Sequence, residues 1–219
     1  MEKFLPVLSR CQLFAGLNDQ DLIAILACLD ARVSTVARHN IVFAEGDRAV
    51  SVGIVLSGSV QIVKEDYYGN RSIVAVAEPG ELFGETFACA GVDALPVSVV
   101  AVQDSQIMLI DCHRITRSCS NACSFHNQIV LNLLQVVASK NLIFNQKLEI
   151  LSKRTTRDKL MAYLTGQAKL RGNSSFSIPY DRQALADYLG VERSAMSAEI
   201  GKLRKDGILS SEKNRFTLL

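Results

Sequence analysis

The chain has 219 residues, of which 48% are hydrophobic and 21% are charged. This balance is typical of a globular protein and excludes a largely disordered chain. No apolar run approaches the roughly 20 residues that a membrane span needs. The amino terminus lacks the basic stretch and long apolar run of a secretory signal peptide, so we expect a cytoplasmic protein that does not enter a membrane.

The formal net charge of +2 conceals an asymmetry between the two ends of the chain. Residues 152–219 hold 13 Lys and Arg against 7 Asp and Glu, whereas residues 1–151 hold 11 against 15. An acidic amino-terminal part joined to a small basic carboxy-terminal part indicates that the latter alone meets a polyanion such as nucleic acid. A basic patch that is merely solvated surface is the alternative.

Cysteine usage does not indicate a disulfide framework. Thiols of a cytosolic chain are expected to stay reduced, and the sequence holds no CxxC pair of the kind that zinc ribbons and thioredoxin-type sites use. We therefore predict free thiols at six positions, which are Cys11, Cys28, Cys89, Cys112, Cys119 and Cys123.

Residues 13–29 predict a short helix near the amino terminus. Asn18 or Asp19 can cap it, because their side chains accept hydrogen bonds from the first turn. The apolar residues that fall on one face of this helix are Leu22, Ile25, Leu26 and Leu29.

From residue 31 to residue 111 the sequence pattern changes to that of β-structure. Short β-branched runs alternate with Gly, Asp, Asn or Pro, and turn signals such as EGDR at 45–48 and YYGNR at 67–71 recur between them. This pattern predicts an antiparallel β-barrel or jelly roll. The expected strands are Asn40–Phe43, Gly53–Leu56, Val60–Val63, Ile73–Val76, Val97–Val102 and Gln106–Ile110.

A long helix is predicted over residues 121–151. Seven of its residues follow the alternating spacing of a heptad seam, with a second apolar stripe beside them. So long a helix rarely buries two stripes in one small domain, so we favour a seam between two copies over one broad core face inside a monomer. Asn141, the polar seam residue, would fix the register of the dimer. The seam is Val130, Leu134, Val137, Asn141, Phe144, Leu148 and Leu151, and the second stripe is Ile129, Leu133, Val136 and Ile143.

The helical pattern pauses in a basic cluster at 151–160 and resumes in a further helix over residues 156–170. Gly172 and Asn173 are natural stop residues for this helix. We place a domain boundary at the pause and expect three parts. These are an effector-sensing barrel at 1–118, a dimerisation helix at 119–151 and a DNA-binding domain at 152–219.

Residues 180–209 contain the most specific motif of the chain. A first short helix is expected at Arg182–Tyr188, with Asp181 as its cap. Ala186 is small where two helices must approach closely, and Gly190 suits the left-handed turn between them. This pattern predicts a helix-turn-helix, and an ordinary helical hairpin is the alternative.

The second helix of the motif follows Val191, which fills the corner, and is ended by Gly207. It has an inward apolar face and, near its start, outward polar side chains that can reach base edges or phosphates. Residues 208–219 alternate as a two-stranded wing with EKNR at its tip. The inward face is Met196, Ile200 and Leu203, and the outward residues are Glu192, Arg193, Ser194 and Ser197.

The whole chain resembles the CRP/FNR family of bacterial transcription regulators. Besides the helix-turn-helix, the resemblance rests on LFAGL at 13–17, FAEGD at 43–47, GIVLSGSVQIVK at 53–64 and PGELFGE at 79–85. The segment FACAG…LPVSVVA is similar to that of an anaerobe-type branch whose effectors are mostly undefined. The implied fold class is α+β, with a cyclic-nucleotide-binding-like barrel, a long dimerisation helix and a winged helix-turn-helix.

The resemblance implies a homodimeric DNA-binding regulator and not an enzyme. A symmetric dimer would bind double-stranded DNA at a palindromic operator with half-sites about one helical turn apart. If the protein activates transcription, RNA polymerase is an implied partner. The identity of the effector, and of any cofactor, is left open.

Family members that bind cyclic AMP have a Gly-Glu pair for the ribose and, ten and eleven residues later, an Arg-Ser pair for the cyclic phosphate. This chain matches the first pair with Gly84 and Glu85, but Leu95 and Pro96 stand at the later positions. A buried phosphate without a cation would cost several kcal/mol. We therefore expect an effector other than cyclic AMP.

A small organic effector is expected to lie in a mainly apolar cavity of the barrel. The alternative interpretation is that Gly84–Ala88 is a structural turn and helix whose side chains pack into the core and leave no ligand cavity. The residues that would bind the effector are Gly84, Glu85, Thr86, Phe87, Cys89, Val97 and Ser98.

A redox- or metal-responsive regulator is the alternative function. Cys119, Cys123 and His126 share one helical face at i, i+4 and i+7. Cys112 and His113 lie just upstream, and Cys89 lies in the segment that follows Gly84 and Glu85. Thiolate and imidazole groups in such a cluster could hold a metal, or the thiols could respond to oxidants. Buried structural thiols are the simpler interpretation, and no metal site is assigned.

The predicted DNA contacts depart in part from the family pattern. Ser194 stands where well-known members have Glu, and Ala198 where they have a second Arg, so their half-site does not carry over. Arg193 and Ser197 match positions that read bases or contact phosphates. The full predicted set is Arg182 and Gln183 as phosphate contacts, with Glu192, Arg193, Ser194, Ser197 and Lys202 on the second helix.

Overall fold

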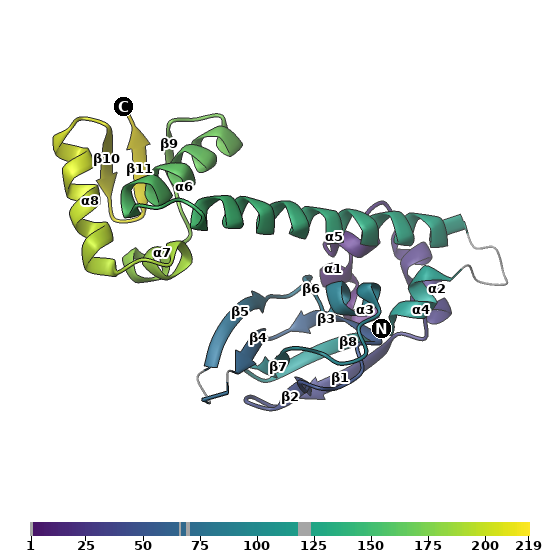
Figure 1. The fold of residues 1–219 in the computed structure, drawn as a ribbon. Helices are drawn as coiled ribbons and strands as arrows, with labels where there is room; N and C mark the ends of the chain where they lie inside the picture. The colour runs from purple at the N-terminus through teal and green to yellow at the C-terminus, as the bar shows by residue number, and fades with distance from the viewer. Residues whose placement is uncertain (1, 66, 69–70, 118–123) are drawn as a thin grey trace. The chain divides into compact units, whose positions relative to one another are not determined.

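The computed structural model describes residues 2–65, 67–68, 71–117 and 124–219. Its contacts divide the chain into two compact units, 1–139 and 140–219 (Figure 1). The boundary between them falls inside helix α5 (Ser124–Leu151), before the boundary at 151/152 that the sequence indicates. The three-part division of the chain by function stays a prediction.

The amino-terminal unit begins with four short helical segments. Asn18 caps the longest of them, since its side-chain oxygen accepts a hydrogen bond from the Asp21 N–H at 2.9 Å, as predicted. The expected apolar face of this helix is buried from Leu22 to Leu29. The segments are η1 (Glu2–Phe4), α1 (Leu5–Leu8), η2 (Gln12–Phe14) and α2 (Asp19–Cys28).

Two four-stranded antiparallel sheets form the barrel of this unit, which confirms the predicted class of fold. One sheet has the order β1-β8-β3-β6 and the other β2-β7-β4-β5. Helix α3 (Glu85–Ala90) lies between β6 and β7 in the chain, and helix α4 (Cys112–Thr116) follows β8. The strands are β1 (Arg32–Val36), β2 (Ile41–Phe43), β3 (Ser51–Ser57), β4 (Val60–Glu65), β5 (Arg71–Ala77), β6 (Leu82–Phe83), β7 (Ser98–Ala101) and β8 (Ser105–Asp111).

Each of the six predicted strands overlaps an observed one, but the sequence pattern does not mark three others. Strand β1 lies at the edge of its sheet and is mostly exposed, so it lacks the alternation of a half-buried strand. Strand β6 has two residues, and β9 (Ser175–Ser177) has three. Runs this short carry almost no periodic signal.

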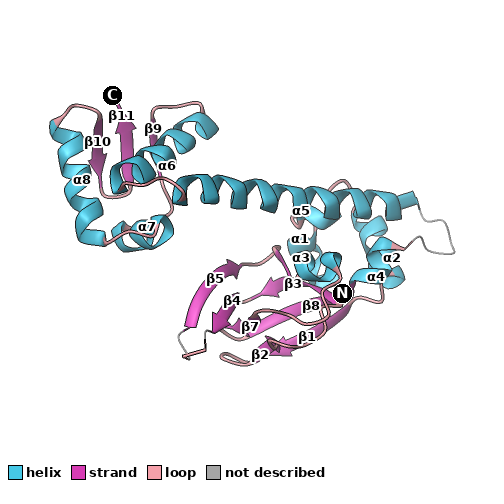
Figure 2. Cartoon of the chain, viewed as in Figure 1, coloured by secondary structure: helices cyan, strands magenta, loops and turns pink. Residues whose placement is uncertain are grey.

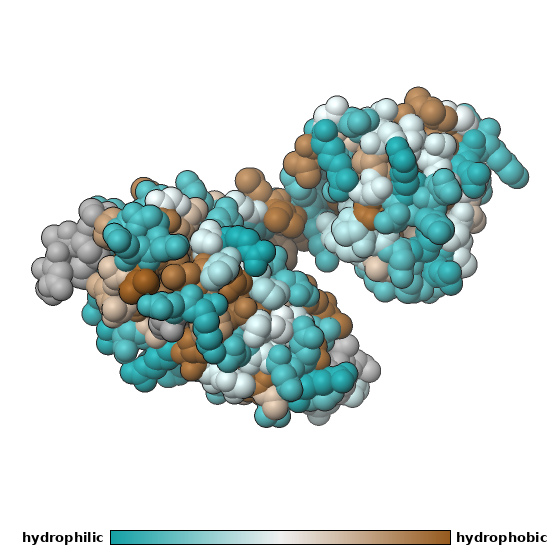
Figure 3. Space-filling model, turned by 180° about the vertical axis from the view of Figure 1, so that it is seen from behind, coloured by the Kyte–Doolittle hydropathy of each residue, from teal (hydrophilic) through white to brown (hydrophobic). Residues whose placement is uncertain are grey.

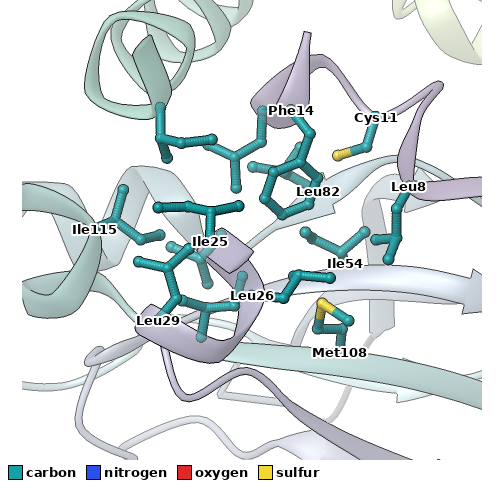
Figure 4. Packing of buried hydrophobic residues seen from close by; sticks show 14 of the residues in the cluster. Leu8, Cys11, Phe14, Ile25, Leu26, Leu29, Ile54, Leu82, Met108 and Ile115 are labelled. Carbon is teal, nitrogen blue, oxygen red and sulfur yellow. The ribbon is translucent and has the colours of Figure 1, made fainter. Parts of the chain in front are cut away.

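The amino-terminal unit has two hydrophobic cores. The first lies between the sheets, where Phe83 packs so closely on Gly53 that a Cβ at that glycine would collide with the ring. The second lies between one sheet and the helices, and Figure 4 shows Phe14, Ile25 and Met108 converging in it.

The first half of α5 belongs to this second core. Ile129, Leu133 and Val136 are buried in it. Asn132 is buried too, and its Nδ2 donates to the carbonyl oxygens of Leu13 and Ala15, both at 2.9 Å. These contacts fix the start of α5 on the LFAGL segment. They also account for the second stripe up to Val136, whereas Ile143 is exposed.

The carboxy-terminal unit is mainly helical, with a small sheet of order β10-β11-β9 (Figure 2). Its core contains Leu160, Leu185, Met196 and Phe216. The predicted stop at Gly172 is confirmed, since this glycine adopts the left-handed conformation at the end of α6. The elements are α6 (Thr156–Arg171), β9, α7 (Arg182–Leu189), α8 (Arg193–Lys205), β10 (Leu209–Glu212) and β11 (Arg215–Leu218).

None of the helices in the described part of the chain is both long enough and apolar enough to cross a membrane.

Candidate DNA-binding and effector sites

Helices α7 and α8 form the corner that the sequence predicts. The Asp181 side chain caps α7 by accepting a hydrogen bond from the Ala184 N–H at 2.8 Å. Gly190 has φ +59°, and the next residue, Val191, donates its N–H to the Ala186 carbonyl at 3.0 Å. A residue other than glycine would be strained at this turn. Ala186 is fully buried, as close packing requires.

Helix α8 presents its first turns to solvent. Met196, Ile200 and Leu203 are buried and hold the opposite face of the helix against the core. A helix fixed in this way can enter a major groove with its amino-terminal side chains leading. The predicted contact residues exposed at this end are Glu192, Arg193, Ser194 and Ser197.

Two further predicted DNA contacts are exposed but engaged with neighbouring acids. Lys202 Nζ lies 2.6 Å from Glu199 Oε1, one turn back on α8. Gln183 Nε2 donates to Asp187 Oδ1 at 2.8 Å on α7. Each side chain can exchange its intrahelical partner for a phosphate oxygen when it contacts DNA. Exposed pairs of this kind contribute at most about 1 kcal/mol, so the exchange is inexpensive.

Arg182, the remaining predicted phosphate contact, is turned into the wing. Its guanidinium carbon lies 5.0 Å from the centre of the Phe216 ring, and Nη2 is 3.3 Å from Ser211 Oγ. Burial, and then the charge of Arg204, lower the pKa of Arg182. Its Nη1 is buried and has no hydrogen-bond partner among the described residues. The guanidinium thus links α7 to the wing and lies near a second positive charge, that of Arg204.

The wing is the hairpin of β10 and β11. Its strands pair from Leu209 with Leu218 to Glu212 with Arg215. Lys213 at the tip has φ +50°, and Asn214 Nδ2 donates to the Ile178 carbonyl at 3.0 Å. The tip is therefore tied to the segment between β9 and α7, and the hairpin matches the predicted wing.

The Gly-Glu pair of the expected effector site lies at the start of α3. Gly84 has φ +78°, and a Cβ on it would lie 3.1 Å from the Phe43 ring and 3.2 Å from the Ser51 carbonyl oxygen. Glu85 is only 2% exposed, and its Oε1 accepts a hydrogen bond from Thr86 Oγ1 at 3.2 Å. This geometry suits a structural turn as well as a binding site.

The other predicted effector residues differ in their surroundings. Thr86 and Cys89 are exposed, Phe87 is half-buried and Val97 is buried. Ser98 Oγ accepts a hydrogen bond from the Glu45 N–H at 3.0 Å. The structure places the set along α3 and the start of β7, and their binding role stays a prediction.

A hollow of about 560 Å³ lies beside β7. Ser98 and Val100 line it, whereas Val99 between them packs in the core, so the hollow opens on the outer face of the sheet. Of the predicted effector residues, Ser98 contributes to this hollow and the other six do not. Its lining is Ile41, Glu45, Val63, Glu65, Tyr67, Ser98 and Val100.

The position expected to hold a phosphate partner is apolar and closed. Leu95 is buried, its N–H donates to the Asp47 carbonyl at 2.8 Å, and its carbonyl accepts from the Gly46 N–H at 2.9 Å. Residues 80–100 contain no Lys or Arg. A phosphate at this place would meet neither a cation from residues 80–100 nor a free backbone donor from Leu95.

The proposed metal or redox cluster falls partly outside the described residues. Cys119 and Cys123 are not described. His126 is buried, and its Nε2 is 2.9 Å from the Ile115 carbonyl, an arrangement in which Nε2 carries the proton and donates. Among the residues that the structure does describe, no three His, Cys, Asp or Glu side chains gather in a way that could hold a metal.

The structure brings together one pair of cysteines that the sequence does not pair. Cys89 Sγ and Cys112 Sγ are 3.7 Å apart. Elsewhere in this unit, burial raises the pKa of Cys11 to about 11. The sequence indicates Cys89 and Cys112 around the same candidate cluster, but their separation of 23 residues carries no local signal that these two thiols meet.

Two family models match the chain. A cyclic nucleotide-binding domain matches residues 33–121, and a Crp-like helix-turn-helix domain matches residues 158–219. Together they cover more than half of the chain. The first match ends just after α4 and the second begins inside α6, so helix α5 lies between them.

Curated relatives match over most of the chain. The transcriptional activator protein FnrL of Cereibacter sphaeroides is 23% identical over 183 residues, which cover 80% of this chain and 71% of that protein. The nitrogen fixation regulation protein FixK of Azorhizobium caulinodans is 26% identical over 190 residues, which cover 84% and 73%. The solved structure of the Thermus thermophilus catabolite activator protein is similar in fold, with a TM-score of 0.57 at 22% identity, and covers 95% of this chain and 93% of that one.

Proposed function

Because this chain belongs to the CRP/FNR family of transcription regulators, we propose that it binds a palindromic operator as a homodimer and responds to an effector other than a cyclic nucleotide. The matched relatives regulate transcription and are not enzymes, so the predicted absence of catalytic activity is confirmed. The observation that carries the proposal is the exposed amino-terminal end of α8, held by a buried apolar face.

The chemistry of α8 supports sequence reading in a major groove. Arg193 is exposed at the first position of the helix and can bind a guanine edge or a phosphate. Ser194 and Ser197 can donate or accept hydrogen bonds with several bases. Ala198, one residue further, offers no polar group, so the half-site read by this helix differs from that of members with arginine there.

The phosphate contacts that we propose surround this helix. Residues 152–219 carry a net charge of +6 by the count of Lys and Arg against Asp and Glu. Arg182 supplies a guanidinium whose Nη1 is without an acceptor among the described residues, and a phosphate oxygen would satisfy it after a change of rotamer. Gln183 and Lys202 would add contacts by releasing Asp187 and Glu199.

The exposed face of α5 supports dimerisation through the predicted seam. Leu134 and Leu148 are each 63% exposed and Phe144 is 53% exposed. Hydrophobic side chains on this helix reach the surface of the molecule (Figure 3). A contiguous apolar stripe on one face is typical of a protein interface. A second copy with the same heptad spacing would cover it, since such a repeat is self-complementary.

Asn141 is the polar member of this seam. In the single chain its Oδ1 accepts a hydrogen bond from Asn145 Nδ2 at 2.7 Å, and both residues are exposed. We propose that Asn141 meets its counterpart in the partner chain and fixes the register of the pair. A parallel, in-register dimer has a two-fold axis, and two copies of α8 related by that axis read inverted half-sites.

The barrel supports an effector that is not a phosphate anion. Leu95 closes the position where a cation would be needed, and Glu85 is an acid buried nearby on α3. A neutral or cationic organic molecule suits these groups better than a nucleotide. We further propose that the protein acts in the cytoplasm, where its operator lies, and that it contacts RNA polymerase if it is an activator.

The test of the proposed function is selection of bound fragments from a pool of random DNA duplexes, with and without cell extract. We expect enrichment of an inverted repeat whose half-sites are separated by about one helical turn. Selection without enrichment, both with and without extract, would refute sequence-specific binding. Enrichment of an unrepeated half-site would refute the symmetric dimer.

A further inference from the structure

Two cysteines from different elements of the amino-terminal unit lie side by side. The Sγ atom of Cys89, in α3, is 3.7 Å from the Sγ atom of Cys112, the first residue of α4. The packing of α3 against α4 makes this contact. The sulfur atoms of a disulfide are about 2.05 Å apart, so the pair has to close by less than about 2 Å to form one.

The two thiols differ in their access to solvent. Cys89 is exposed, whereas Cys112 is only 4% exposed. The backbone of Cys112 is held at both of its polar groups, because its N–H donates to the Val50 carbonyl at 2.9 Å and its carbonyl accepts from Thr116 Oγ1 at 3.1 Å. A reagent from solvent therefore reaches Cys89 first and finds Cys112 directly behind it.

The helix that carries Cys89 is bounded by two glycines. Helix α3 lies between Gly84 and Gly91, which both adopt the left-handed conformation. No described atom lies within 4 Å of the place where a Cβ on Gly91 would be. Cys89 is two residues from this uncrowded end of the helix. The closure of less than about 2 Å that a disulfide requires would take place at this end of the helix.

The pKa shifts of the two thiols favour loss of the first proton from the exposed sulfur. A hydrogen bond from the Cys112 thiol lowers the pKa of Cys89, and it outweighs the effects of burial and of Glu85, which act in the opposite direction. The same hydrogen bond, together with burial, raises the pKa of Cys112. The exposed sulfur is thus the one with thiolate character, and the thiolate is the nucleophile in thiol chemistry.

We propose that Cys89 and Cys112 form a dithiol site for hydroperoxides, in which Cys89 is oxidised first and Cys112 then closes a disulfide. The Cys89 thiolate attacks the outer oxygen of the hydroperoxide, the O–O bond breaks, and the leaving alkoxide takes up a proton. Cys89 becomes a sulfenic acid. The Cys112 sulfur then attacks the Cys89 sulfur, the S–O bond breaks, and water leaves with the thiol proton. The two cysteines lose two electrons, and the hydroperoxide is reduced to an alcohol and water.

The disulfide would join two parts of the barrel that have different tasks. Helix α3 begins with the Gly84-Glu85 pair of the expected effector site, and α4 precedes the segment that leads into α5. A covalent link between α3 and α4 removes their freedom to separate. The chemistry of the site stands apart from the proposed function, whereas any use of it in regulation rests on that function.

The test is a disulfide map of the full-length protein. Reduced protein is treated with hydrogen peroxide or cumene hydroperoxide, free thiols are blocked with iodoacetamide, and the chain is cut before aspartates and after Lys and Arg. Cys89 then lies on fragment 72–92, Cys112 on fragment 111–114, and Cys119 and Cys123 on fragment 118–140. We expect fragments 72–92 and 111–114 to be joined, with a mass equal to the sum of the two fragments minus two hydrogen atoms. Dithiothreitol should separate them again and restore both thiols.

Two variants complete the experiment. In Cys112→Ser the sulfenic acid on Cys89 should persist and be trapped by dimedone, while Cys28→Ser, which removes a thiol outside the pair, should form the same disulfide as the wild type. Recovery of Cys112 fully alkylated after oxidation would overturn the proposal, and so would a link from fragment 72–92 to itself or to fragment 118–140. The map of the wild-type protein decides the matter even if a variant does not fold. DNA binding by the reduced protein is measured separately and tests the proposed function alone.

Discussion

The guanidinium group of Arg182 lies 5.0 Å from the centre of the Phe216 ring and connects the first helix of the helix-turn-helix to the wing. Replacing Arg182 by Ala should therefore loosen the wing, because it removes a cation–π contact and a hydrogen bond to Ser211. We expect a loss of about 1 kcal/mol in local stability. Hydrogen exchange of the amides of residues 209–218 in the full-length protein measures this change. Lys169→Ala, an exposed charge removed from α6, is the matched control, and equal exchange in both variants would contradict the assignment.

The seam of α5 gives a prediction about oligomeric state. Leu148→Glu should convert the dimer to monomer, because a carboxylate buried in an apolar interface costs several kcal/mol. Leu148 is 63% exposed in the single chain, so the fold of each chain should survive. Gln146→Glu adds the same charge at an exposed position off the seam and should leave the dimer intact. Sedimentation velocity distinguishes the two, and a Leu148→Glu dimer would argue for a different interface.

Arg193 gives a prediction about sequence reading. Arg193→Ala should weaken binding to the selected operator by ~1–3 kcal/mol if the side chain reads a base, and it should also relax the sequence preference at one position of each half-site. Removal of a phosphate contact would instead weaken binding to all sequences and reduce its salt dependence. Fluorescence anisotropy over a salt series separates these outcomes, with Lys169→Ala as the control. An affinity equal to that of the wild type would show that Arg193 does not contact DNA.

Leu95 and Pro96 give a prediction about the effector. Titration calorimetry with cyclic AMP should show no saturable binding. A dissociation constant at or below about 1 μM, which corresponds to a binding free energy of roughly 8 kcal/mol, would disprove the prediction that cyclic AMP is not the effector. The reason is that residues 80–100 hold no Lys or Arg and that Leu95 is buried where the phosphate would lie.

The Cys89 thiol gives a prediction about pH dependence. Its pKa is lowered by the hydrogen bond from Cys112, so the thiolate persists at lower pH than in an ordinary cysteine. The rate of alkylation by iodoacetamide should therefore reach its plateau at lower pH in the wild type than in Cys112→Ala. The negative charge of Glu85 raises the pKa of Cys89, and that of Asp111 raises the pKa of Cys112. Both carboxylates remain in the Cys112→Ala variant, so they do not account for a difference between the two profiles. Peptide mapping of the alkylated Cys89 fragment follows the rate, and identical pH profiles would contradict the hydrogen bond.

Features that depend on neighbours in the chain were predictable. Asn18 and Asp181 are caps because each accepts a hydrogen bond from an N–H three residues on. Gly190 marks the corner because a left-handed turn favours glycine. The exposed apolar stripe from Leu134 to Leu148 follows from periodicity, which a helix converts directly into a face, whereas its role as a dimer seam stays a prediction.

Contacts between residues distant in the chain were not predictable in this way. Asn132 donates hydrogen bonds to Leu13 and Ala15, more than a hundred residues away, although its sequence neighbourhood gives no sign of a buried amide. The sequence also located some site residues without indicating which side chains surround them. Arg182 was expected as a phosphate contact from its place at the start of a helix, but its packing on Phe216 follows from how the wing folds back.

The sequence by itself determined the order of barrel, long helix and winged helix-turn-helix, the family to which the chain belongs, and the lack of a cationic partner for a phosphate beside Glu85. Caps, turns and periodic faces are properties of short segments, so a sequence displays them directly. The tertiary structure alone decided that Cys89 and Cys112 lie 3.7 Å apart and that one is exposed while the other is buried. Distance and burial are set by how α3 packs on α4, and no pattern within either segment specifies that packing.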